Sequence, residues 1–264
     1  IPPLSSARAA CGVLKHGAYI YLAGGTRTGP VLGSVAWLES YGPLTGEEAA
    51  STVSPSSRWE RKASMSVQRG WFGFTALGHT LFAMGGRNER NQELSLVEAY
   101  DTRTDAWTKK RDMQANRFGV AAVALGSFVY AIGGLDKQAL RTVERYDSAT
   151  DTWTYVASLN KGRFQLGAAV VNGHIYACGG VTSSTFTGMM EKYDAGTDQW
   201  EVLSPMPTAR RALGLVAVNN HVVALGGYAS KCVPTVESYS VEEGRWERRA
   251  SLSQPLHYPG VVAV

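Results

Sequence analysis

Short apolar segments that end in a pair of glycines recur five times along the chain. The segments lie at 18–23, 80–84, 128–132, 174–178 and 221–225, and the glycine pairs follow them at 24–25, 85–86, 133–134, 179–180 and 226–227. Such segments are typical of buried strands, and glycine at their end permits a positive φ or a close approach of two backbones. The last three intervals between pairs are 46 to 48 residues, and the first is 61. This period, with one insertion, indicates a repeat architecture.

Each repeat predicts four short strands. The first is a small, valine-rich run after an arginine, as at 117–123, and the second ends at the glycine pair. The third ends in a tyrosine (Tyr41, Tyr100, Tyr146, Tyr193 and Tyr239), and the fourth carries a tryptophan (Trp59, Trp107, Trp153, Trp200 and Trp246). In repeats two to five these two residues are seven positions apart, which suits a tight hairpin. In the first repeat they are eighteen apart, and the extra residues within 42–57 predict a solvated loop.

The fold class expected from this pattern is all-β. Four short antiparallel strands cannot bury both faces alone, and stacking such sheets as blades around an axis solves this and protects the sheet edges. The first strand of each repeat, rich in Ala, Gly and Val, fits the crowded centre. The large tyrosine and tryptophan side chains are expected between neighbouring blades.

These features resemble the Kelch repeat: the glycine pair, Tyr-Asp at 100–101, 146–147 and 193–194, and the tryptophan seven residues after the tyrosine. The resemblance implies a single β-propeller domain over residues 1–264, with repeats at about 8–60, 69–108, 117–154, 163–201 and 210–247. We predict five four-stranded blades; because Kelch-like proteins mostly have six, a six-bladed array cut short is the alternative. Two segments are candidates for the innermost strand of the first blade, 9–14 and 259–264, and we predict that the C-terminal one closes the ring there.

The composition of the chain argues against several classes of function. The net charge is +4, from 26 Lys and Arg against 22 Asp and Glu. This small excess is far from the clustered basic residues of a nucleic-acid-binding protein. The three cysteines form no metal-binding spacing and are odd in number, which favours a reducing, cytoplasmic location. No apolar stretch is long enough to span a bilayer, so no membrane partner is expected.

Catalysis is not expected, and neither is a cofactor or a metal. Four of the five histidines, His16, His79, His174 and His221, lie just before the second strand of their repeats. They are therefore expected on different blades, too far apart to share one metal. The chain contains no Gly-x-Ser-x-Gly, phosphate-loop or His-Glu-x-x-His motif.

Arginines recur at the start of the first strand: Arg8, Arg69, Arg117, Arg163 and Arg210. A ring of guanidinium groups at one mouth of the central channel could bind carboxylates, which favours an acidic partner. A second interpretation stays open, because glutamates recur two residues before each tyrosine, at Glu39, Glu98, Glu144, Glu191 and Glu237. Each arginine could instead pair with such a glutamate and have a structural role.

The segments after the glycine pairs vary while the framework repeats, which is typical of recognition loops on a rigid scaffold. In the Kelch-like adaptors that the chain resembles, these loops and the first-strand arginines contact bound peptide. The resemblance therefore implies partner-binding roles for Arg69, Arg117, Arg163, Arg210, Arg87, Asn88, Tyr228, Arg27 and Phe186.

The function implied is a non-enzymatic module that binds a protein or peptide, such as a degron. It would be the substrate-recognition domain of an adaptor for a cullin-RING ubiquitin ligase. The cullin link would run through a BTB region outside these residues. The alternative is a cytoskeletal (actin-binding) or scaffolding Kelch protein.

Overall fold

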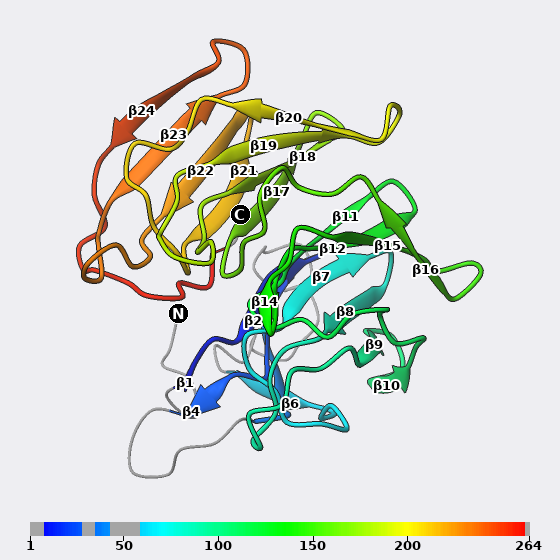
Figure 1. Ribbon diagram of the computed structural model, residues 1–264. Coiled ribbons are helices and arrows are strands. Elements are labelled where there is room, and N and C mark those ends of the chain that lie inside the picture. Colours follow the sequence, from blue (N-terminus) through cyan, green and yellow to red (C-terminus); the bar gives the residue numbers. More distant parts are fainter. Residues whose placement is uncertain (1–7, 28–34, 43–58, 262–264) are drawn as a thin grey trace.

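Five four-stranded antiparallel sheets form a five-bladed β-propeller (Figure 1). The computed structural model describes residues 8–27, 35–42 and 59–261. Blade 1 contains β2 (Gly12–His16), β3 (Tyr19–Ala23), β5 (Leu38–Tyr41) and β6 (Glu60–Lys62), and blade 2 contains β7 (Gly73–Leu77), β8 (Thr80–Met84), β9 (Val97–Asp101) and β10 (Ala106–Lys109). Blade 3 contains β11 (Ala121–Leu125), β12 (Phe128–Ile132), β15 (Val143–Asp147) and β16 (Thr152–Val156). Blade 4 contains β17 (Gly167–Val171), β18 (His174–Cys178), β19 (Met190–Asp194) and β20 (Gln199–Leu203), and blade 5 contains β21 (Gly214–Val218), β22 (His221–Leu225), β23 (Val236–Ser240) and β24 (Arg245–Arg249).

The first strand of each blade lies closest to the axis. Strands β2, β7, β11, β17 and β21 contact one another in that order. Their small residues permit this approach: a Cβ atom added to Gly73 would lie 2.8 Å from the Cβ of Ala122 in the next blade. Two short strand pairs, β1 (Arg8–Ala9) with β4 (Thr26–Arg27) and β13 (Leu135–Asp136) with β14 (Gln138–Ala139), lie outside the blades. Four clusters of buried apolar side chains fill the interfaces between consecutive blades.

The predicted hairpin between the third and fourth strands is confirmed. Tyr146 lies directly opposite Trp153, and their ring centroids are 5.0 Å apart. The Tyr146 hydroxyl donates a hydrogen bond of 2.7 Å to Asp151, which has a φ of 51° at the turn. Blades 2 and 4 repeat this arrangement, with hydroxyl–carboxylate distances of 2.8 and 2.7 Å. The seven-residue spacing therefore encodes a turn that its own aspartate stabilises.

The tryptophans connect neighbouring blades, as predicted. The indole Nε1 of Trp153 donates to the carbonyl of Arg111, which follows the outer strand of blade 2. Trp107, Trp200 and Trp246 make the equivalent bond to the preceding blade, at 2.8 to 2.9 Å. Each large side chain thus fills an interface and satisfies a backbone carbonyl there.

The glycine pairs also join blades. Gly85 has a φ of 64°, and a Cβ atom on it would lie 2.4 Å from the carbonyl oxygen of Arg117 in blade 3. The amide of Gly86 donates to that same oxygen at 2.7 Å. Only a residue without a side chain permits both the left-handed conformation and this approach.

The predicted closure of the ring is wrong in one respect. The innermost strand of blade 1 is β2 (Gly12–His16), which overlaps the other candidate segment. Residues 259–261 form no strand, and 262–264 lie outside the described residues. The C-terminal segment nevertheless contacts both blade 5 and blade 1: a Cβ on Gly214 would meet Val261, and one on Gly260 would meet Val13. It is wedged between these blades instead of replacing a strand. Most of the predicted 42–57 loop lies outside the described residues.

Candidate functional site: the loop mouth of the propeller

The four arginines predicted to bind a ligand are buried inside the blades. The side chains of Arg69, Arg117, Arg163 and Arg210 are 0% exposed. Each pairs with a glutamate of its own blade: Glu98, Glu144, Glu191 and Glu237, respectively. Arg8 forms the corresponding pair with Glu39 in blade 1.

These pairs hold each blade together. Arg117 Nη1 also donates to the carbonyls of Gly133 and Thr142, at 2.6 and 2.8 Å. Burial lowers the pKa of Arg163, and the Glu191 carboxylate opposes that effect. The structure thus has the glutamate-paired arrangement, and its physical reason is that a buried guanidinium needs a counter-charge and acceptors. Because they are buried, these four arginines are not part of the exposed surface at the mouth.

The residues directly after the buried arginines do reach the mouth. They form β-bridges with the residues that follow the glycine pairs: Gly70 with Arg87, Phe118 with Leu135, Phe164 with Val181 and Arg211 with Tyr228. This pairing sets the variable side chains around one end of the propeller. Loops on a rigid sheet framework are well suited to recognition.

Aromatic rings form a continuous path across this end, which we call the aromatic mouth. Its members are Phe186, Tyr228, His257, Tyr258, Trp71, Phe118 and Phe164, and successive centroids lie 4.5 to 6.5 Å apart. Phe118 is buried, and the other six are partly or fully exposed. The path draws on blades 2 to 5 and on the C-terminal segment, so the tertiary structure assembles it.

Two arginines lie on these rings. The Arg87 guanidinium is 4.0 Å from the centroid of Phe118 and pairs with Glu93 at 2.5 Å. The Arg211 guanidinium lies 5.0 Å from the ring of Tyr228 and 5.6 Å from that of Phe186. Cation–π contacts of this kind hold the charged groups in place.

The structure brings some of the predicted loop residues together. Phe186 and Tyr228 are in contact, and Arg87 lies on the neighbouring Phe118. Asn88 shapes its own loop, because its Oδ1 accepts hydrogen bonds from the amides of Arg90 and Gln92 at 3.0 Å. Arg27 is described only through its backbone pairing with Arg8.

The sequence reasoning missed Trp71, Phe118, Phe164, Arg211, His257 and Tyr258. All six lie one or two positions after a first-strand arginine, or after Leu256 at the same place in the last segment. Comparing those positions among the repeats would have found them. The arginines themselves point into the blades, and the next two residues face the mouth and the axis.

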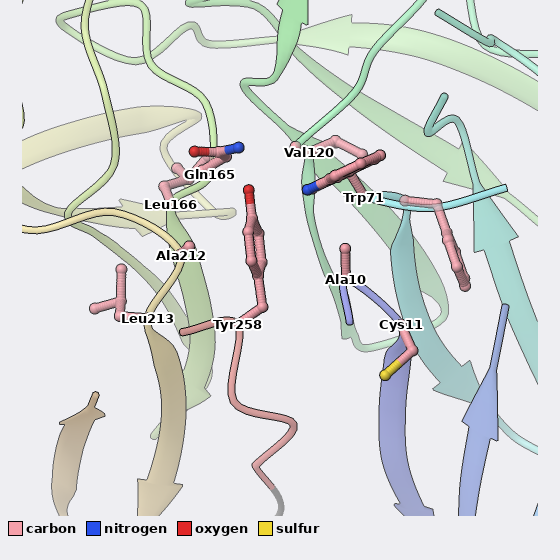
Figure 2. Close-up of a pocket in the computed structure, with 11 residues that line it drawn as sticks. Ala10, Cys11, Trp71, Val120, Gln165, Leu166, Ala212, Leu213 and Tyr258 are labelled. Atoms are coloured by element: carbon pink, nitrogen blue, oxygen red, sulfur yellow. The ribbon is translucent and has the colours of Figure 1, made fainter. Parts of the chain in front are cut away.

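A pocket opens on the axis of the propeller (Figure 2). Six residues at equivalent positions surround it, all with φ between 51 and 62°: Ala10, Trp71, Gly119, Gln165, Ala212 and Tyr258. Backbone hydrogen bonds of 2.7 to 3.0 Å join them in sequence, each amide donating to the carbonyl of the preceding member. The left-handed conformation is uncommon for residues other than glycine and is found often at binding sites.

The histidines are not all as far apart as expected. The rings of His16 and His79, from blades 1 and 2, have centroids 6.3 Å apart, because the turns of adjacent blades meet at that end. Burial and the neighbouring His79 lower the pKa of His16. Within the described ranges, however, no group of three or more His, Cys, Asp or Glu side chains could hold a metal ion. The described part of the chain also contains no helix able to cross a membrane.

The chain is similar to several proteins that contain Kelch repeats. A family model described as the KLHDC2/KLHL20/DRC7 Kelch-repeats domain matches residues 71–257. Kelch-like protein 36 of Bos taurus is 32% identical over 141 residues, which are 52% of this chain and 20% of that protein. Kelch-like protein 8 of Caenorhabditis elegans is 35% identical over 101 residues, 38% of this chain and 14% of that protein. Alpha-scruin of Limulus polyphemus is 35% identical over 80 residues, 30% of this chain and 9% of that protein, so the matches span a fifth or less of these relatives.

Proposed function

Because the chain belongs to the Kelch-repeat family, we propose that it is a non-enzymatic module that binds a peptide or protein partner on the aromatic mouth. One observation carries this proposal: six partly or fully exposed ring side chains and two arginines, from blades 2 to 5 and the C-terminal segment, lie together at one end of the propeller. Aromatic residues and arginine are the side chains most enriched in the energetically dominant parts of protein interfaces.

The charge of this surface supports a partner with acidic groups. Arg211 has no carboxylate partner among the described residues, and its Nη1 donates instead to the neutral side chain of Gln165. Burial and Arg211 lower the pKa of His257, which keeps its imidazole neutral near pH 7. Among the described residues, Arg211 therefore supplies a positive charge at the mouth that no carboxylate neutralises. Arg87, by contrast, is partly neutralised by Glu93.

For the cellular role, we propose the substrate-recognition domain of an adaptor for a cullin-RING ubiquitin ligase, acting in the cytoplasm. The similarity to Kelch-like proteins supports this role. The cullin would be recruited by a BTB region outside these residues. The cytoskeletal or scaffolding alternative would use the sides of the blades, where Tyr155 and Val202 are 49% and 56% exposed on the outer strands of blades 3 and 4.

Replacing Tyr228 by alanine is expected to weaken partner binding by about tenfold or more, as for a central aromatic of an interface. The probes are peptides selected from a random displayed library on the wild-type domain, and their affinities are measured by fluorescence polarisation. Tyr155→Ala is the matched control, an exposed tyrosine on the side of blade 3. It should bind as the wild type does. Equal affinity of wild type and Tyr228→Ala, with loss in Tyr155→Ala, would instead place the binding surface on the blade sides.

A further inference from the structure

We propose that two copies of this chain associate through β16 (Thr152–Val156), the outer strand of blade 3, which pairs with the same strand of the second copy in antiparallel orientation. β16 lies at the edge of its sheet, where it pairs with β15 alone, and on the perimeter of the propeller (Figure 1). This inference goes beyond the proposed function, because it concerns a surface away from the aromatic mouth.

The charge pattern of the outer strands sets blade 3 apart. Among the outer strands that the structure describes, β16 alone has no charged residue; its sequence is Thr-Trp-Thr-Tyr-Val. The other four carry charges: Glu-Arg-Lys in β6, Lys109 in β10, Glu201 in β20 and Arg-Trp-Glu-Arg-Arg in β24. Charged side chains on an edge strand oppose its pairing with another chain. The edge of blade 3 lacks this protection and consists of β-branched and aromatic residues, which favour strand pairing.

The backbone of β16 presents hydrogen-bonding groups on its outer side. The carbonyl of Trp153 points away from β15, because it accepts a hydrogen bond of 3.0 Å from Gln114 Nε2. The N–H and C=O groups of alternate residues in an antiparallel pair share a side, so those of Tyr155 also point outward. A carbonyl oxygen has two lone pairs, and that of Trp153 can therefore accept a second bond. The side chain of Tyr155 is exposed, which leaves this edge accessible to another strand.

The side chains of β16 complement those of a second β16. In an antiparallel pair centred on Thr154, this residue lies opposite its own copy, and Trp153 lies opposite Tyr155 of the second copy. Aromatic pairs and threonine pairs are favourable across neighbouring strands. Trp153 packs in the interface with blade 2 and Val156 in the interface with blade 4, as the alternation along a strand requires. Both Trp153–Tyr155 pairs therefore form on one face of the joined sheet, which favours a second copy over an unrelated strand.

The antiparallel arrangement leaves both aromatic mouths free. The chain enters β16 from the hairpin at the far end of the propeller and leaves it toward the mouth, where Phe164 pairs with Val181. Two copies joined in this way therefore direct their mouths in opposite directions. The dimer carries two binding surfaces and can engage a partner with two sites. Because the edge is only one short strand, we expect a weak, reversible association.

Sedimentation velocity of the chain at about 10 to 500 μM tests the dimer. The weight-average mass of the wild type should rise with concentration. Thr154→Lys should weaken association by about tenfold or more, because it places two lysines opposite each other. Thr108→Lys is the matched control, since Thr108 is exposed and follows the tryptophan of β10 as Thr154 follows that of β16. The control should associate as the wild type does, and urea midpoints check that both variants are folded.

A mixture of Thr154→Lys with Thr154→Glu gives the sharper test. Each variant alone should remain monomeric where the wild type associates, and the equimolar mixture should form a heterodimer, because lysine then lies opposite glutamate. This rescue is expected only if residue 154 lies opposite its own copy. A wild-type mass independent of concentration, unchanged association of Thr154→Lys, or no rescue in the mixture would overturn the proposal.

The variant Tyr228→Ala separates this proposal from the proposed function. It should associate as the wild type does while losing affinity for the selected peptides, because Tyr228 belongs to the aromatic mouth. If Tyr228→Ala abolished association instead, the second copy would occupy the mouth, and the dimer through β16 would be wrong.

Discussion

Replacing Arg117 by alanine is expected to lower the free energy of unfolding by about 3–5 kcal/mol, because it leaves Glu144 as an unpaired charge inside blade 3. Both side chains are 0% exposed and lie 2.9 Å apart. The arginine also satisfies the carbonyls of Gly133 and Thr142, so its loss removes several buried hydrogen bonds at once. The measurement is urea denaturation followed by tryptophan fluorescence.

The matched control is Arg103→Ala. Arg103 pairs with Asp101 at 2.8 Å, but its side chain is 66% exposed. Solvent screens an exposed ion pair so that it contributes little to stability, and this variant should therefore unfold almost as the wild type does. The double variant Arg117→Met with Glu144→Leu should recover part of the lost stability, because it removes both charges together. If Arg117→Ala kept its stability and lost partner binding instead, the arginine would have the ligand role that the sequence first suggested.

The second large effect is expected from alanine at Gly133. Gly133 has a φ of 62°, and a Cβ atom on it would lie 2.5 Å from the carbonyl oxygen of Arg163 in blade 4. A left-handed alanine alone costs about 1–2 kcal/mol. Displacing the neighbouring blade to relieve this contact should lower the free energy of unfolding by a further amount of about 1–3 kcal/mol.

Gly126 separates the two contributions. It lies in the turn between β11 and β12 of the same blade, with a φ of 60°, and a Cβ atom there meets nothing within 4 Å. Gly126→Ala should therefore show only the conformational cost of about 1–2 kcal/mol. Urea midpoints of the two variants measure the difference. Equal destabilisation of both would contradict a role for Gly133 in packing one blade against the next.

Much of the fold was predictable because its signals are local. The strand that ends at Gly133 and Gly134 and the hairpin from Tyr146 to Trp153 are each written within a few adjacent residues. The preferences of turn residues, and the alternation of side chains along a strand, also act over a few adjacent residues. The fivefold repetition of these signals predicted the number of blades, and the need to bury both faces of each short sheet predicted their stacking around an axis.

The binding surface was predictable only in part. The variable positions after the glycine pairs pointed to Tyr228 and Phe186, and the structure brings these two rings together. Trp71, Gln165 and Tyr258 lie in three distant parts of the sequence and share only their place in the repeat, two residues after a first-strand arginine or after Leu256. They meet because equivalent positions of successive blades converge on the axis.

By itself, the sequence determined the repeat unit, its four strands and the end of the propeller at which the chain varies, since these depend on neighbouring residues. Only the tertiary structure decided whether Arg117 faces a ligand or Glu144, because a guanidinium suits both partners equally and the choice depends on which carboxylate folding brings near. It likewise decided where the C-terminal segment lies, because pairing within blade 1 and wedging between blades 5 and 1 bury similar apolar residues. Charge pairing and ring closure both depend on contacts between distant segments. The free energy of these contacts depends on how deeply the groups are buried, and a short stretch of sequence does not show that.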